Sequence, residues 1–222
     1  DSKDVRGVML LIDSPGGAVS GIAAFAQQVA ASTRRKATTA YVLGSCCSAA
    51  YWIGSAATRI SIDRTAVLGS IGVVAAVPKQ VGPGQDGMVE IEIVSSNAPN
   101  KRPDPQSDDG SSEIRRSLDA LERVFVGDVS RGRGVPTSKV VNDFGKGGIL
   151  IGADAVNAGM ADAVETQAAA RSLMKVSILS PNNRRASDGN QHRLAALRRG
   201  GMHKTESNQA RMNRLRVAGF KR

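Results

Sequence analysis

The sequence predicts an α/β fold in which parallel strands alternate with helices. Apolar runs of strand length recur at residues 5–13, 37–43, 59–62 and 71–77, and helical patterns lie between the earlier runs. Such alternation is typical of a parallel sheet that is covered by helices. With 222 residues, of which 41% are hydrophobic, the chain is long enough to bury a sizeable core. Only 3% are aromatic, so aliphatic side chains, alanine and the 24 glycines must pack the layers.

Each early element has its own pattern. Residues 5–13, VRGVMLLID, form a continuous apolar run, which predicts a strand buried on both faces, and SPGG ends it. Apolar side chains at helical spacing from Val19 to Ala30 then predict a helix that stops at the basic residues STRRK. The second strand, at 37–43, leads into a helix that opens near Ser48.

The later elements are less regular. Residues 88–94, MVEIEIV, place apolar and acidic residues on opposite faces, which predicts a half-exposed strand. Residues 95–112 are polar and broken by prolines, which indicates a loop. An amphipathic helix is expected from Ile114 to Val129, ending near RGRG, and 147–164 predict a strand, a short helix and a final strand.

The charge divides the chain in two. The net charge is +10, and residues 176–222 hold 11 Lys and Arg against two acidic residues, whereas 1–175 hold 19 against 18. We therefore predict a folded domain over 1–175 and a basic tail over 176–222, mobile or partly helical at 191–199 and 207–217, because its few apolar residues cannot build a core. Such a tail would attract an acidic protein or nucleic-acid phosphates through contacts that weaken with salt.

Composition argues against several classes of function. No run reaches the roughly 18–20 apolar residues of a membrane helix, and no signal peptide is visible. Cys46 and Cys47 are adjacent, so a disulfide between them would be strained, and we expect small buried thiols in a reducing compartment. Both histidines, His192 and His203, lie near the far end of the chain. This disfavours a Ser-His-Asp triad and a Cys/His metal site, so we expect neither metal nor cofactor.

Two short stretches contain the residue types used in acyl transfer. In DSPGG, Gly16 and Gly17 leave uncrowded N–H groups at a helix start, which either form an oxyanion hole or merely punctuate a turn. In GSCCSAAYWIGSAA, Ser48 follows a strand and opens a helix, so its hydroxyl is either a nucleophile or a small packing group.

A nucleophilic serine without a nearby histidine needs another base, and a lysine can serve. A lysine amine is basic at neutral pH only where desolvation lowers its pKa from about 10.4 toward 7–8. Lys79 and Lys101 lie between Ser48 and the long helix. Each is either that base or a solvated surface charge.

Four segments in this order resemble the signal peptide peptidase A family. They read LLIDSPGG, CCSAAYWIGSAATRI, TAVLGSIGV and VSSNAPNK, and IGADAVNAGMAD follows them. The likeness covers residues 5 to about 165 and is greater to the tailed-phage branch, the protein C type head maturation proteases. It implies a Clp protease/crotonase-like superhelix of strand–strand–helix units. It also implies a serine endopeptidase with a Ser/Lys dyad that cleaves scaffold or capsid proteins.

The resemblance assigns three catalytic side chains. It implies that Ser48 is the nucleophile. It implies that Lys101 is the base, because SSNAPNK matches a family segment of the type SGAHK, although Asn97 replaces the usual glycine and the segment is one residue longer. It implies that Ser70, in GSIGV, hydrogen-bonds the lysine amine and orients it.

The resemblance also bears on the surroundings of the site. It implies an oxyanion hole formed by the amides of Gly17 and Ala49, beside Gly16. It implies protein substrates, assembly as a homo-oligomer, and a location in the bacterial cytoplasm or the phage procapsid. Family members carry strands before IDSPGG, whereas this chain opens at Asp1 almost directly on a strand. That opening is typical of a fragment and leaves room for an upstream strand or membrane anchor.

Three other functions fit part of the pattern. One is a signal-peptide-degrading peptidase of the same family. A crotonase-like acyl-CoA enzyme would share the superhelix and oxyanion hole, but its base is often a glutamate, and the first one here is Glu90. Ser48 and Ser70 would then have no role, and a thioester hydrolysis assay separates the two. The third is a non-catalytic capsid or scaffold-binding protein that acts through its basic tail.

Overall fold

The computed structural model describes residues 2, 4–77 and 92–179. Residues up to Met174 form one compact unit, and Lys175 begins a second, of which only the end of a helix is described. Lys79, most of the strand predicted at 88–94 and the helices predicted in the tail lie outside the described residues.

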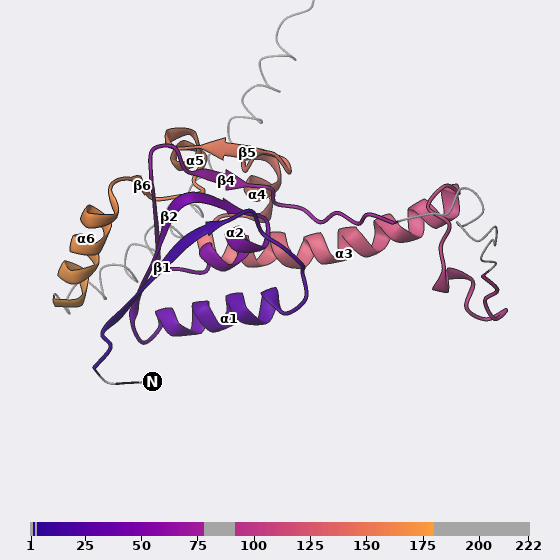
Figure 1. Ribbon diagram of the computed structural model, residues 1–222, viewed down its shortest axis with the longest axis horizontal. Helices are drawn as coiled ribbons and strands as arrows, with labels where there is room; N and C mark the ends of the chain where they lie inside the picture. The colour runs from indigo at the N-terminus through magenta and orange to yellow at the C-terminus, as the bar shows by residue number, and fades with distance from the viewer. Residues whose placement is uncertain (1, 3, 78–91, 180–222) are drawn as a thin grey trace, which may run out of the picture. The chain divides into compact units, whose positions relative to one another are not determined.

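Six strands of the described residues form one curled sheet (Figure 1). The strands are β1 (Gly7–Ser14), β2 (Ala37–Cys47), β3 (Arg59–Ile62), β4 (Val67–Gly69), β5 (Ile149–Ile151) and β6 (Ala163–Val164). Their order is β5-β4-β2-β3-β6, and β1 also pairs with β2. These pairs are parallel, apart from β4 with β5. The predicted α/β class is thus confirmed.

Helices cover the sheet and supply most of the remaining core. They are α1 (Ile22–Thr33), α2 (Ala49–Gly54), α3 (Asp108–Arg133), α4 (Thr137–Asp143), α5 (Ala153–Ala158) and α6 (Gln167–Leu179), with a 3-10 turn η1 (Pro99–Lys101). Helices α1, α2 and α3 pack against one another, and α4 packs against α3 (Figure 1). None of the helices within 4–77 and 92–179 has the length and apolar character needed to cross a membrane.

The core lies between the sheet and this helical layer. Tyr51 of α2, Phe125 of α3 and Ile60 of β3 are among its largest fully buried side chains. Leu10 of β1 packs against this core, but Leu11 is 51% exposed on the opposite face. The prediction that this strand is buried on both faces was therefore wrong, because the face that carries Leu11 is open to solvent among the described residues.

The predicted strand at 71–77 is also wrong. The strand of this region is β4, which ends at Gly69, and the chain then leaves the sheet at two residues with positive φ, Gly69 and Ser70. Ile71 is still buried, but Val74 is 91% exposed. The apolar run was interpreted as a strand, but its residues 72–74 line a cavity that is described below. Residues 92–94 likewise form no strand.

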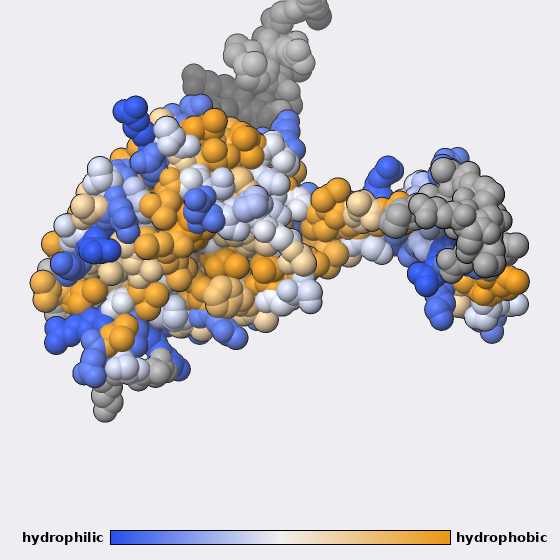
Figure 2. Space-filling view, viewed as in Figure 1, coloured by the Kyte–Doolittle hydropathy of each residue, from blue (hydrophilic) through white to orange (hydrophobic). Residues whose placement is uncertain are grey.

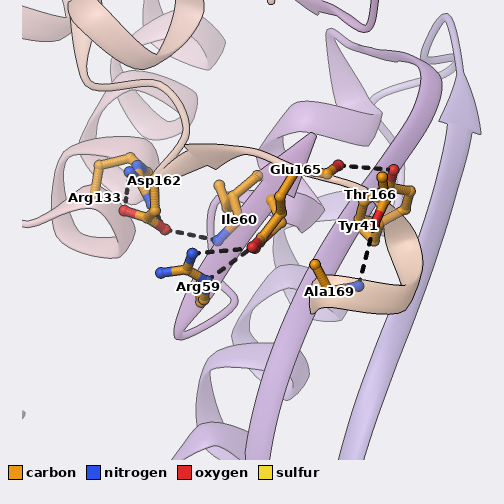
Figure 3. A network of polar contacts seen from close by, with 9 residues as sticks. Tyr41, Arg59, Ile60, Arg133, Asp162, Glu165, Thr166 and Ala169 are labelled. Carbon is orange, nitrogen blue, oxygen red and sulfur yellow. Dashed lines mark hydrogen bonds and ion pairs between the residues drawn. The ribbon is translucent and has the colours of Figure 1, made fainter. Parts of the chain in front are cut away.

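A polar network fastens the end of the first unit to the sheet (Figure 3). The guanidinium of Arg133, at the end of α3, donates to both carboxylate oxygens of Asp162, at 2.8 and 3.2 Å. Asp162 also accepts a 2.7 Å bond from the amide of Ile60 in β3. Arg59 forms an ion pair with Glu165 at 3.1 Å. The short strand β6 is thereby held at its place beside β3.

Candidate active site

The turn between β2 and α2 presents a single serine. Strand β2 ends at Cys47 and α2 begins at Ala49, so Ser48 stands alone at the N-cap position, as the sequence predicted. Its φ of 52° and ψ of −125° are sparsely populated for a residue with a side chain. The N–H of Ser48 donates to the carbonyl of Gly69 at 2.8 Å, which fixes the turn against β4. A strained serine between strand and helix is the arrangement that exposes a nucleophile in many hydrolases.

The turn after β1 lies directly against Ser48. Strands β1 and β2 run parallel with Ser14 opposite Cys46, so their ends are neighbours. Gly16 has φ 106°, and a Cβ at this position would lie 2.7 Å from the Cβ of Ser48 and 2.8 Å from the carbonyl oxygen of Cys47. Only glycine fits here, because both the positive φ and the close approach exclude a side chain.

A cavity of about 380 Å³ opens beside Ser48, and we call it the Ser48 cavity. Its walls are the turn after β1, the start of α2, residues of the segment 70–74, Phe125 of α3 and Gly147. Of the residues predicted for the site, Gly17, Ser48, Ala49 and Ser70 line it, and Gly16 adjoins Ser48. Gly17, Ser48 and Ser70, which lie 22 to 53 positions apart in the sequence, are thus brought together.

Two backbone amides at the Ser48 cavity are free to bind an anion. Neither the N–H of Gly17 nor that of Ala49 donates a hydrogen bond to another described residue. A Cβ on Gly17 would meet nothing within 4 Å, so this side of the turn is open. Free amides beside a nucleophile are the donors that stabilise the oxyanion of a tetrahedral intermediate.

Ser70 lies beside Ser48 on the cavity wall, because Gly69 pairs with Cys47, and it has a second strained backbone. Its φ is also 52°, and its N–H donates to the carbonyl of Gly148 at 2.7 Å. A side chain on the preceding Gly69 would clash with that same carbonyl oxygen. The turn before β5 therefore fixes the position of Ser70.

Lys101 does not reach the Ser48 cavity within one chain. It ends η1, in the segment 92–107 that Figure 1 shows at the N-terminal end of α3. The side chain of the adjacent Asn100 contacts Glu113 at 3.4 Å. From Glu113, α3 runs about 18 Å along its axis before Phe125 reaches the cavity wall. A lysine side chain cannot span that separation.

The neighbouring cysteines are not candidates for the nucleophile. Both are free and buried, as predicted. Burial raises the pKa of the Cys47 thiol, and burial together with the nearby Cys47 raises the pKa of Cys46. Both thiols therefore stay protonated at neutral pH, so neither is an activated nucleophile.

Three residues that shape the site were not predicted. Asp13 accepts a 2.9 Å bond from the amide of Ser45, and so joins the end of β1 to β2. Trp52 stacks on Phe125 with ring centroids 4.5 Å apart, and both rings line the Ser48 cavity. An Asp directly before SPGG was a visible sequence feature, whereas the ring pair joins residues 73 positions apart and leaves no local pattern.

Apolar side chains also remain exposed beyond the cavity. Figure 2 shows hydrophobic residues gathered over α3 between its two ends. The exposed ones on this helix are Leu121 and Val124, and Val74, Val77 and Ile93 are exposed in the segments around it. Exposed apolar patches of this kind are common at surfaces that bind other proteins. The described residues contain no group of His, Cys, Asp or Glu side chains placed to hold a metal ion.

Comparison with known proteins identifies related peptidases. The family model "Peptidase family S49" matches residues 30–178. The head-tail preconnector protein GP5 of Enterobacteria phage P21 is 29% identical over 80% of this chain, and the capsid assembly protease C of Escherichia phage lambda is 29% identical over 77%. The chain spans 36% of the length of the former and 39% of the latter.

A solved structure, that of a peptidase from Plasmodium falciparum, superposes with a TM-score of 0.47 at 11% identity. The superposition covers 74% of this chain and 82% of that one, and the likeness is too low to decide between folds. The family match and the phage relatives confirm the resemblance that the sequence motifs indicated.

Proposed function

The chain belongs to peptidase family S49, and from this premise we propose that it is a serine endopeptidase whose nucleophile is Ser48. The observation that carries the proposal is the strained Ser48 at a cavity that also holds two unpaired amides. That arrangement suits acyl transfer, in which a hydroxyl attacks a carbonyl and nearby donors bind the oxyanion.

The proposed mechanism uses a Ser48–Lys101 dyad. Neutral Lys101 takes the proton of Ser48, and the Ser48 oxygen attacks the peptide carbonyl. The amides of Gly17 and Ala49 bind the oxyanion, and Lys101 then protonates the departing amine. Water, activated by the same lysine, hydrolyses the acyl-enzyme. Ser70 acts as the hydroxyl that orients the lysine amine.

We propose that Lys101 reaches the Ser48 of a second copy of this chain. Two observations support this arrangement. Lys101 lies about 18 Å along α3 from the cavity wall and is exposed. The helix between them carries the exposed apolar patch, which a second copy would cover. Burial in such an interface also favours the neutral lysine that catalysis needs.

The phage relatives support a proposal for the class of substrate. The lambda relative is named a capsid assembly protease. We therefore propose capsid or scaffold proteins as substrates, cleaved in the procapsid or the host cytoplasm. The parallel strands and the helix after Ser48 are compatible with a Clp protease/crotonase-like superhelix, which we propose as the fold.

The nucleophile is tested with a fluorophosphonate probe and intact-mass analysis. We expect the unaltered chain to gain one probe adduct on Ser48 and Ser48→Ala to gain none. Peptide cleavage should fall by about 10⁵–10⁶-fold in Ser48→Ala. Ser45→Ala is the matched control, since Ser45 lies in β2 three residues before Ser48 but does not line the cavity. Cleavage retained by Ser48→Ala would remove the basis of the proposal.

The second-copy arrangement is tested by mixing two inactive variants. Ser48→Ala keeps its lysine and Lys101→Ala keeps its nucleophile, so their mixture contains complete sites only if the two groups come from different chains. We expect the mixture to regain part of the activity that each variant lacks. The two variants are refolded together so that mixed assemblies can form. If this mixture is as inactive as either variant alone, the second-copy arrangement is wrong, but the role of Ser48 is not affected.

A further inference from the structure

Strand β2 contains a bulge shortly before Ser48. The regular pairing of β1 with β2 is interrupted between Ile12 and Ser14. Within this interruption, residues 43–45 of β2 lie opposite the single residue Asp13 of β1. A bulge bends its strand and re-aims the side chains that follow it, and bulges are common beside active sites.

The bulge is also the place where β2 changes its other partner. Residues 39–42 of β2 pair with β3, and residues 45–47 pair with β4. The second of these segments leads directly into Ser48 at the start of α2. The direction in which the chain enters the turn at Ser48 therefore depends on how the bulge is held.

The side chain of Asp13 occupies the bulge. Its Oδ1 accepts a 2.9 Å bond from the amide of Ser45. A Cβ on Gly44 would lie 2.7 Å from that same oxygen, so glycine at this position leaves the room that the carboxyl group takes. Among the described residues Asp13 does not line the Ser48 cavity, so its effect on Ser48 passes through the backbone.

Asp13 also adjoins the other half of the site. It directly precedes Ser14, whose hydroxyl accepts a 3.2 Å bond from the amide of Gly16. Gly16 lies against Ser48, since an added Cβ would come within 2.7 Å of the serine Cβ. The turn that carries the proposed oxyanion donor Gly17 and the strand that carries the proposed nucleophile are therefore joined at Asp13.

We propose that Asp13 is a positioning residue that fixes Ser48 relative to the amide of Gly17 through its bond in the β2 bulge. The proposal rests on the proposed function, because it takes Ser48 as the nucleophile. Catalytic groups must be held within about 0.5 Å of their productive geometry. Loss of the Asp13 bond lets the bulge relax, and a displacement of about 1 Å at Ser48 can lower turnover by about 10²-fold.

The chain offers three informative variants and a matched control. Asp13→Ala removes the acceptor, whereas Asp13→Asn keeps an acceptor oxygen of the same reach. Gly44→Ala keeps Asp13 but places a methyl group against its carboxyl oxygen, and the φ of Gly44 lies outside the positive range, so the change acts through that contact. Asp63→Ala is the control, because Asp63 also accepts a 2.9 Å bond from a backbone amide, that of Thr65, and does not line the Ser48 cavity.

The experiment uses the full chain and measures peptide turnover, the rate at which a fluorophosphonate labels Ser48, and the free energy of unfolding in urea. We expect Asp13→Ala and Gly44→Ala to lower kcat and the labelling rate by about 10- to 100-fold, while KM changes by less than about threefold. Asp13→Asn and Asp63→Ala should stay within about threefold of the unaltered chain in kcat. Asp13→Ala and Gly44→Ala break the same contact, so the variant that combines them should be no slower than the slower of the two.

The control separates positioning from stability. If Asp13→Ala and Asp63→Ala lower the free energy of unfolding alike but only Asp13→Ala slows labelling, the positioning role is supported. An equal loss of turnover in Asp63→Ala overturns it, because the effect is then not specific to the bulge. Unaltered turnover in Asp13→Ala overturns it as well.

The remaining variants test the bond itself. If Asp13→Asn is as slow as Asp13→Ala, the retained acceptor does not hold the bulge and the proposal is wrong. A combined variant slowed by the product of the two single effects also contradicts it. If Asp13→Ala does not fold, Gly44→Ala decides, since slow labelling supports the role and unaltered labelling overturns it. Failure to label Ser48 in the unaltered chain overturns the proposed function, and the positioning role with it.

Discussion

Substituting Gly16 with alanine tests whether the turn after β1 fixes the position of Ser48, the proposed nucleophile. An alanine here must adopt a φ near 106°, which costs about 1–3 kcal/mol for a residue with a side chain. Its methyl would also lie 2.7 Å from the Cβ of Ser48 and 2.8 Å from the Cys47 carbonyl oxygen, so backbone must move. Overpacking of this kind costs about 1–3 kcal/mol. We expect Gly16→Ala to lower the free energy of unfolding by about 2–6 kcal/mol in total.

The neighbouring Gly17 provides the control. A Cβ there would meet nothing within 4 Å, and its φ lies outside the positive range. Gly17→Ala should therefore leave the stability unchanged or raise it by up to about 1 kcal/mol. Alanine keeps the backbone N–H, so the proposed oxyanion donor survives and peptide turnover should stay within about tenfold. Gly16→Ala should reduce turnover by about 10²-fold or more, because it displaces Ser48.

Urea denaturation followed by circular dichroism measures the stability of both variants, and a fluorogenic peptide measures turnover below the unfolding transition. The geometry predicts opposite results for the two glycines. Gly16→Ala should lose both stability and turnover, and Gly17→Ala should keep both. If Gly16→Ala is as stable and as active as the unaltered chain, the contact with Ser48 does not constrain the site, and the reasoning fails.

Three further predictions concern the base, the polar network and the tail. Lys101→Arg should fold but lose activity, because arginine cannot deprotonate, while Lys139→Arg stays active in the same peptide assay; an active Lys101→Arg would exclude it as the base. Arg133→Met should lower the free energy of unfolding by about 2–4 kcal/mol in urea denaturation, because Arg133 is 8% exposed and Asp162 loses its charged partner, whereas Arg131→Met should lower it by less than about 1 kcal/mol, because Arg131 is 72% exposed. Truncation after Leu179, the end of α6, should preserve peptide turnover but weaken salt-dependent cleavage of an acidic full-length scaffold protein; loss of peptide turnover would assign the tail to the catalytic fold.

The parts of the fold that could be predicted are those with a local pattern. The turn at Ser48 follows an apolar run and precedes small helix-forming residues, so strand, turn and helix were all visible in sequence. The start of α3 was missed by six residues, although Ser107 caps it and accepts from the amide of Gly110 at 3.0 Å. Two aspartates follow in its first turn, which is a helix-start pattern that the polar loop concealed.

Other features depend on contacts that no local pattern encodes. Helix α4 has seven residues, and Val140 is its one buried residue, so its amphipathic signature is too short to detect. The strand predicted at 71–77 failed because an apolar run can serve either a sheet or a cavity wall. Lys101 was assigned as the base from its motif alone, and the order of motifs carries no distance. Only the length of α3 reveals how far Lys101 lies from Ser48 in one chain.

The placement of backbone strain links the fold to the proposed chemistry. Ser48 and Ser70 adopt positive φ at the ends of neighbouring strands beside one cavity, and each is held by a hydrogen bond from its own amide to a carbonyl of a neighbouring segment. Neither conformation is favoured by the residue itself, so each persists because the segments around it determine it. Glycines make this packing possible, since Gly16 and Gly69 leave room where a side chain would displace those segments. A packing serine in a relaxed helix start would need none of these constraints, and their convergence on Ser48 is the structural reason to regard its hydroxyl as the reacting group.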